Sequence, residues 1–152
     1  MPISPQDIKK LRLKTGAGVM DCKKALTEAK GNYKKALEIV KKAGMARADK
    51  KQDRETKIGY IAHYVHANNQ VAALVEVLCE TDFVALNSDF QSMAKDLAMQ
   101  VVAMSPKDVP ELLEQEFVKD PSLTVAELVK TVSGKVGEKF VVSRFSRMKV
   151  GE

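Results

Sequence analysis

The sequence of 152 residues predicts an α+β fold, in which a bundle of three helices precedes a small three-stranded antiparallel sheet packed with helices. Two observations support this. Before residue 44 the apolar residues recur at helical spacing, whereas residues 58–65, 71–79 and 140–150 are rich in β-branched and aromatic side chains. The intervening residues are almost all charged or small. We therefore expect a three-helix domain over residues 1–44, a charged linker over 45–57 and an α+β core domain over 58–152.

The first three helices are marked by residues that cap or break helices. Ser4 is a candidate N-cap and Pro5 suits the first helical position, so a helix is expected from here to about Lys14. Two glycines then allow a tight reversal before a second helix over residues 19–29. A third helix is expected over residues 33–43, ending at Gly44. These helices carry few large apolar residues, so their shared core is expected to be small.

The linker and the first strands follow from a change of pattern. Residues 45–57 have no sustained apolar stripe, which favours a solvated linker with at most partial helix. Residues 58–65 alternate in a strand pattern, and Asn68-Asn69 offers a turn, so a hairpin with residues 71–79 is expected. Residues 71–79 are apolar on both alternating sets, which predicts a largely covered strand.

The rest of the core is predicted to be helical until the last strand. Apolar residues recur at helical spacing over residues 90–102, behind the candidate caps Asn87 and Ser88. Two X-Pro pairs then break the chain, and two shorter helices are expected, one through Leu112 to Phe117 and one through residues 125–132. With a closing strand over residues 140–150, the economical arrangement is a three-stranded antiparallel sheet with helices on one face.

A five-residue connector joins the second strand to the long helix. It reads Thr81-Asp82-Phe83-Val84-Ala85, which places an acid beside a large aromatic residue. In one interpretation Phe83 fills the top of the core while Thr81 or Asp82 caps the start of a helix, as connectors of this length often do. In the other, Phe83 is held outward to contact a partner.

Charge is distributed unevenly along the chain. Residues 1–57 carry 16 lysines and arginines against 7 acidic residues, whereas the remainder carries 9 against 13, for a formal net charge of +5. The basic part could bind RNA through its lysines. Tyr33 is its only aromatic residue, however, so base stacking has little support, and the charge could instead steer encounter with an acidic protein surface.

Catalytic, metal and membrane functions find little support in the residues. Cys22 and Cys79 have no paired spacing, His63 and His66 are too sparse for a metal site, and the glycines do not follow a strand as phosphate-binding loops do. We expect no enzymatic activity, cofactor or bound metal. No segment reaches the length of a membrane span and the first residues lack a signal-peptide pattern, so the cytoplasm is the expected location.

Three segments, in order, resemble bacterial elongation factor Ts, the family of guanine-nucleotide exchange factors for elongation factor Tu. They are Leu11-Arg12-Leu13-Lys14-Thr15-Gly16-Ala17-Gly18-Val19-Met20-Asp21-Cys22-Lys23-Lys24-Ala25-Leu26, Val75-Glu76-Val77-Leu78-Cys79-Glu80-Thr81-Asp82-Phe83-Val84-Ala85 and Val136-Gly137-Glu138-Lys139-Phe140-Val141-Val142-Ser143-Arg144-Phe145. The resemblance implies that the first domain is ubiquitin-associated-like (UBA-like), that elongation factor Tu is the partner and that exchange proceeds by disturbing the partner's magnesium and phosphate site.

The resemblance also implies which residues bind the partner. Asp82 and Phe83 map onto the family residues that intrude beside the magnesium ion, and Arg12, Val19 and Met20 onto contacts with the nucleotide-binding domain. Met20 could instead belong to the bundle core, and Arg12 could be an ordinary solvated charge. The expected partner-binding set is Arg12, Val19, Met20, Thr81, Asp82, Phe83 and Val84. Short family members pair as homodimers, and pairing would protect the edges of a three-stranded sheet.

Overall fold

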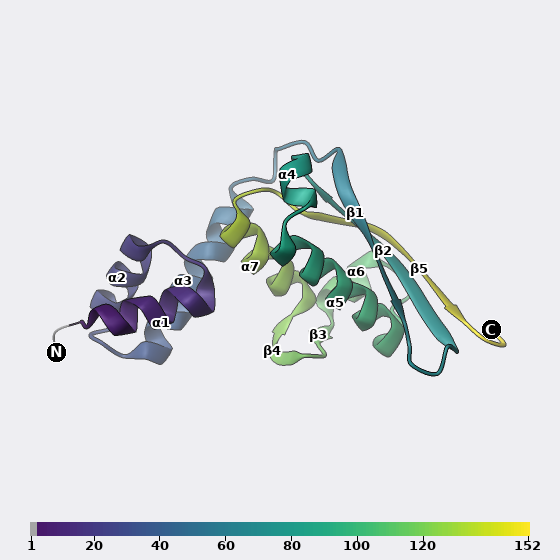
Figure 1. Ribbon diagram of the computed structural model, residues 1–152, viewed down its shortest axis with the longest axis horizontal. Coiled ribbons are helices and arrows are strands. Elements are labelled where there is room, and N and C mark those ends of the chain that lie inside the picture. The colour runs from purple at the N-terminus through teal and green to yellow at the C-terminus, as the bar shows by residue number, and fades with distance from the viewer. Residues whose placement is uncertain (1–2) are drawn as a thin grey trace.

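The computed structural model describes residues 3–152, which form a helical amino-terminal unit joined to an α+β core (Figure 1). The core contains a three-stranded antiparallel sheet with helices packed against one face, so the predicted fold class is confirmed. The amino terminus lies at the helical end of the molecule and the carboxyl terminus at the far end of the sheet. Among residues 3–152, no helix is both long and apolar enough to cross a membrane.

The amino-terminal unit consists of α1 (Pro5–Thr15), α2 (Val19–Glu28) and α3 (Tyr33–Asp49). The Ser4 hydroxyl accepts the backbone N–H of Asp7 at 3.1 Å and so caps α1. At the other end of α1, Gly16 adopts a left-handed φ of 68°, a conformation that glycine takes without a steric penalty. The Asn32 side chain caps α3 in the same way as Ser4 caps α1, at 3.1 Å from the Lys35 nitrogen.

Helix α3 does not end where the sequence predicted. It continues through Gly44 to Asp49, so part of the predicted linker is helical. The reason is tertiary, because the carboxyl half of α3 packs along α7 (Val125–Val136) of the core. A turn over the following residues leads to the first strand at Ile58.

The main sheet has the order β1 (Ile58–Val65), β2 (Val71–Cys79) and β5 (Val141–Lys149), with both pairs antiparallel. Asn69 takes a left-handed φ of 57° in the hairpin between β1 and β2, as predicted for the Asn-Asn turn. The register of β2 against β5 shifts between Glu76 and Val77, which marks a β-bulge.

Only one face of this sheet is covered. Ala62, Val75 and Val77 point toward the helices and are fully buried. On the opposite face Leu74 is 52% exposed and Ile61 56% exposed. The prediction that β2 is largely covered agrees with its burial, because only Leu74 among its residues is exposed. That exposure arises because the helices pack on the inner face.

Helices α4 (Asp82–Ala85), α5 (Ser88–Met104), α6 (Val109–Glu114) and α7 complete the core. Helix α5 packs across β1 and β2, and α7 lies between α5 and α3. The rings of Phe90 and Phe140 meet edge to face, with centroids 4.8 Å apart, close to the start of α5.

The segment after α6 differs from the prediction of a helix that includes Phe117. It forms a small hairpin of β3 (Glu116–Phe117) and β4 (Asp120–Thr124). The fully buried Gln100 of α5 holds it in place, because its amide oxygen accepts the Val118 N–H at 2.9 Å and its amide nitrogen donates to the Glu116 carbonyl at 3.0 Å. Because Gln100 is distant in sequence from the hairpin, no local sequence pattern predicts this contact.

Candidate functional site

The connector Thr81–Ala85 is an exposed tip. Its Phe83 is 84% exposed and lies on the single turn of α4 at the edge of the core (Figure 1). The interpretation in which Phe83 fills the core is therefore wrong. Asp82 is also exposed, and its Oδ1 accepts the Phe83 backbone N–H at 3.0 Å.

A single carboxylate holds the base of this tip. Glu138 accepts the backbone N–H groups of Glu80 and Thr81 through Oε1, each at 3.0 Å, and the Thr81 hydroxyl through Oε2 at 2.6 Å. The Thr81 hydroxyl in turn accepts the Val84 N–H at 3.4 Å as the N-cap of α4. Thr81 therefore stabilises the conformation of the tip, and its contact with a partner stays a prediction.

Two further contacts fix the other side of the tip. Ala85, the last residue of α4, is buried, and its carbonyl accepts the side-chain amide N–H of Gln91 at 3.0 Å. Val84 is half-buried against the core. The backbone of the tip is thus tied at both ends, while the Phe83 ring projects freely. Because the backbone of the tip is already held, binding through Phe83 costs side-chain conformational entropy but little backbone entropy.

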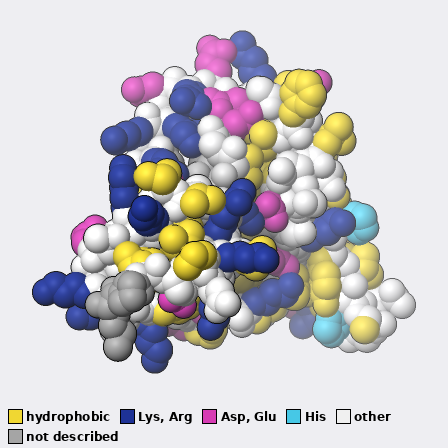
Figure 2. Space-filling model, turned by 60° about the vertical axis from the view of Figure 1, so that its left-hand side comes forward, with side chains coloured by type: hydrophobic (Ala, Val, Ile, Leu, Met, Phe, Trp, Pro, Cys, Tyr) yellow, Lys and Arg dark blue, Asp and Glu magenta, His cyan; other side chains and the backbone are white. Residues whose placement is uncertain are grey.

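The amino-terminal unit carries the other predicted group. Met20 is 62% exposed and Val19 48% exposed at the start of α2, so Met20 does not belong to the bundle core. Arg12 is exposed on α1. Figure 2 shows hydrophobic side chains gathered among Lys and Arg on the face that this unit turns forward. An apolar group with a cationic surround suits an acidic protein surface that has an apolar centre.

The structure does not bring the two groups together. Arg12, Val19 and Met20 lie on the amino-terminal helices, whereas Asp82 and Phe83 lie on α4 of the core. The two units meet where α3 packs against α7 (Figure 1). A partner that contacts both must span the molecule.

Sequence reasoning missed three residues at these surfaces. Leu86, three positions after Phe83, is 79% exposed, and Leu13, next to Arg12, is 78% exposed. Their proximity to Phe83 and Arg12 in the sequence was an available signal. The role of Glu138 had no local signal, since its hydrogen-bond partners lie 57 and 58 residues away.

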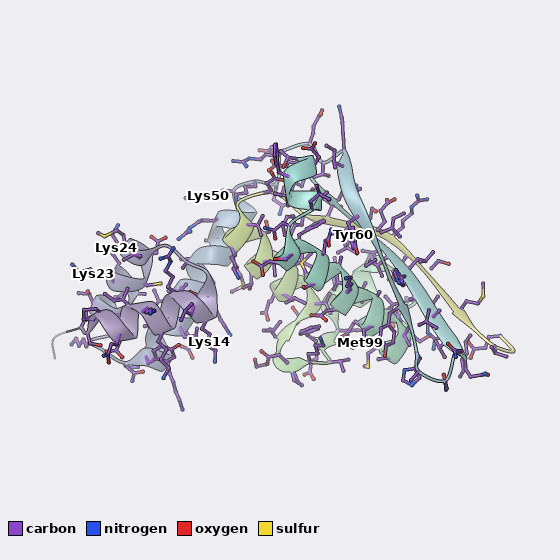
Figure 3. All side chains as sticks on the ribbon, in the orientation of Figure 1. Lys14, Lys23, Lys24, Lys50, Tyr60 and Met99 are labelled. Atoms are coloured by element: carbon purple, nitrogen blue, oxygen red, sulfur yellow. The ribbon has the colours of Figure 1, made fainter. Side chains whose placement is uncertain are left out.

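The basic surface offers little for stacking of nucleic-acid bases. Lys14, Lys23 and Lys24 lie on the amino-terminal helices, far from the sheet (Figure 3). Tyr33 is half-buried against the bundle core, and the Lys10 ammonium lies 5.1 Å from its ring centroid. The aromatic face that could stack on a base is thus already occupied.

The cysteines and histidines were the residues that the sequence offered for metal binding or nucleophilic chemistry. No group of three His, Cys, Asp or Glu side chains is placed to hold a metal ion within residues 3–152. Burial raises the pKa of the Cys79 thiol to about 11, assisted by the nearby Glu138 carboxylate, so the thiol stays protonated near neutral pH. His63 lies on the open face of the sheet and Cys79 on the face that the helices cover, so the two form no nucleophile pair.

Comparisons with known proteins give one consistent result. The family described as "Elongation factor TS" matches residues 34–111 and 80–152. The chain is 40% identical to elongation factor Ts of Fervidobacterium nodosum over 197 aligned positions that cover 100% of both proteins. It is 40% identical to that of Herpetosiphon aurantiacus over 196 positions, with 99% of each covered. Because this chain has 152 residues, those two relatives contain internal segments that it lacks.

A third relative is longer still. Elongation factor Ts of Clostridium kluyveri is 43% identical over 150 residues, which cover 99% of this chain and 49% of that protein.

Proposed function

The chain belongs to the elongation factor Ts family of translation elongation factors, and on that premise we propose that it is a guanine-nucleotide exchange factor. It binds elongation factor Tu in the GDP-bound form, promotes release of GDP and so allows GTP to bind. The observation that carries the proposal is the exposed Phe83 on a tip whose base is hydrogen-bonded at both ends.

An exchange factor must bind the nucleotide-free partner better than the nucleotide-bound one. Linkage makes this coupling reciprocal, so the bound factor weakens GDP binding by the same ratio by which bound GDP weakens binding of the factor. Several kcal/mol of differential binding are needed to accelerate release by orders of magnitude. Full burial of one Phe contributes about 1.5–3 kcal/mol, so the ring of Phe83 alone cannot both anchor the partner and distort its site.

The two exposed groups divide this work. Phe83 is an apolar wedge suited to separate packed elements beside the nucleotide, and Asp82 brings a carboxylate toward the partner's magnesium ion. Mg²⁺ tolerates departures from octahedral geometry poorly, so a displaced ligand weakens its hold on the phosphates. Arg12, Val19 and Met20 grip the nucleotide-binding domain through directional donors and apolar contact.

Release of fluorescently labelled GDP from elongation factor Tu tests this division. With Phe83→Ala we expect the saturating release rate to fall about ten-fold or more, because about 1.4 kcal/mol of wedge burial corresponds to a factor of ten. With Arg12→Ala we expect the half-saturating concentration to rise about ten-fold, since a charge-assisted contact is lost. Asp82→Ala reports whether the carboxylate contributes separately.

Two exposed residues outside these groups provide matched controls. Met104→Ala removes a half-exposed apolar side chain and Lys107→Ala removes an exposed cation, and both should leave release unchanged. Phe83→Ala should alter the free energy of unfolding by less than about 0.5 kcal/mol, as expected for a surface position. A Phe83→Ala protein that releases GDP as fast as the wild type would overturn the proposed wedge.

We also propose that two copies pair through the open face of the sheet. That face carries the exposed apolar side chains of Ile61, Val65, Leu74 and Met148. It also carries an ion pair between Glu76 and Arg144, with the two charged groups 3.2 Å apart. Pairing of two copies through this face would cover its apolar side chains.

A further inference from the structure

The amino-terminal unit meets the core where two helix backbones touch. Gly134 of α7 faces Gly44 of α3, and a Cβ added to Gly134 would overlap the Gly44 carbonyl and lie 2.9 Å from the Gly44 Cα. Such a distance is too short for any real side chain. Gly134 is buried, so the approach of α3 to α7 depends on its missing side chain.

The contact is asymmetric in a useful way. A Cβ added to Gly44 would meet no atom within 4 Å. Both glycines lie inside helices, where each costs about 0.5–1 kcal/mol relative to alanine. Only at Gly134 does the packing between the two helices require glycine.

Other contacts accompany this approach. Lys130 of α7 pairs with Asp49 of α3 at 2.9 Å. The aliphatic stem of Lys135 lies against the backbone of Gly16 at the end of α1, and its ammonium reaches Asp89 at the start of α5 at 3.1 Å. The ion pair of Lys130 with Asp49 and the packing of Lys135 on Gly16 therefore join the amino-terminal unit to α7 of the core.

The two units have separate hydrophobic cores. One is built around Leu11, Cys22 and Leu26, and the other around Phe90, Leu97 and Val101. Neither core contains a residue of the other unit, so the α3–α7 contact, and not a shared interior, sets their relative position.

We propose that Gly134 is a positioning residue for nucleotide exchange. Its close contact with Gly44 fixes the grip surface of Arg12, Val19 and Met20 relative to the tip of Asp82 and Phe83, so that both engage one partner at once. This inference rests on the proposed function. A small rotation between α3 and α7 is amplified toward the ends of both units, and a displacement of about 1 Å can cost two orders of magnitude in rate.

The test compares Gly134→Ala with Gly44→Ala, the same change made on the two sides of one contact. In Gly134→Ala the grip surface is intact but the tip is displaced. We therefore expect the saturating rate of GDP release to fall at least about ten-fold, while the half-saturating concentration changes less than about three-fold. Gly44→Ala should keep both values, because its methyl group points into open space.

A second measurement needs no partner protein. Spin labels on Lys24→Cys in α2 and Lys95→Cys in α5 report the distance between the units, since both positions are exposed and the native Cys22 and Cys79 are fully buried. Gly134→Ala should shift or broaden this distance, and Gly44→Ala should not. Asp49→Lys replaces the attraction between Asp49 and Lys130 by repulsion, at a position outside both cores. It should also shift or broaden the label distance, and it provides this test even if Gly134→Ala folds poorly.

The outcomes separate two kinds of failure. If the wild-type chain releases no GDP from elongation factor Tu, the proposed function fails and the inference fails with it. If the wild type is active and Gly134→Ala and Asp49→Lys match Gly44→Ala in saturating rate, exchange stands and the positioning role is overturned. An unchanged label distance in Gly134→Ala would overturn it as well.

Discussion

Glu138 is the residue on which the geometry of the tip depends most. Its carboxylate accepts three hydrogen bonds from Glu80 and Thr81. Glu138→Ala removes all three, and each half-buried donor left without a partner costs about 1–3 kcal/mol. We expect the free energy of unfolding, measured by urea titration, to fall by at least the cost of one such donor, about 1–3 kcal/mol. The saturating GDP-release rate should fall further than stability alone explains, because Phe83 is no longer held in place.

Variants of intermediate severity separate holding the tip from folding. Glu138→Gln keeps an acceptor for the two backbone N–H groups but not for the Thr81 hydroxyl as well, so its release rate should lie between those of wild type and Glu138→Ala. Glu114→Ala, at an exposed position, is the control. If Glu138→Ala lowered stability but released GDP at the wild-type saturating rate, its role would be structural only.

At single residues, sequence alone identified the tip but not its support. The resemblance to elongation factor Ts indicated Asp82 and Phe83 as partner-binding candidates, and the structure gives them the exposure such a role needs. Whether Phe83 pointed inward or outward could not be read from the pattern. Exposure depends on how the loop is anchored, and the anchor at Glu138 is brought near only by the pairing of β2 with β5.

At the scale of elements, local signals located most helices and strands but failed where tertiary contacts decide. The caps at Ser4 and Asn87 and the Asn68-Asn69 turn lie where the sequence indicated. Gly44 was expected to end α3, because glycine often follows a helix end. In the structure it lies inside the helix, where its backbone packs against Gly134 of α7.

The β3–β4 hairpin depends on one buried amide. Gln100→Leu keeps a similar volume but leaves the Glu116 carbonyl and the Val118 N–H without their partner. We expect it to lower the free energy of unfolding by about 1–3 kcal/mol, measured by urea titration. Exchange of the Val118 amide hydrogen with solvent should accelerate, because the hairpin opens more readily.

The matched control for Gln100→Leu is the same change at an exposed position, Gln6→Leu in α1, which should leave stability within about 0.5 kcal/mol of wild type. Equal stability of wild type and Gln100→Leu would show that the hairpin is held by its own hydrophobic contacts, chiefly those of the buried Phe117.

At the scale of the molecule, β2 carries apolar residues on a face that the single chain leaves open. Its two alternating sets of apolar residues are typical of a strand covered on both faces, yet only one face is covered here. Leu74 and Ile61 lie on the open face, at 52% and 56% exposure. The apolar residues on the open face of β2 are explained if a second copy of the chain covers that face.

Leu74→Glu tests this at the centre of the open face. Leu74 lies between His63 of β1 and Ser146 of β5, so a new carboxylate there would be desolvated by pairing. We expect the wild type to sediment as a dimer at micromolar concentration and Leu74→Glu to weaken pairing at least about ten-fold.

Thermal unfolding of the diluted monomer should be unchanged, because Leu74 does not belong to either hydrophobic core. Val118→Glu, an equally drastic change on the β3–β4 turn, should leave the dimer intact. A wild-type chain that sediments as a monomer while releasing GDP at full rate would mean that the open face has another occupant or none.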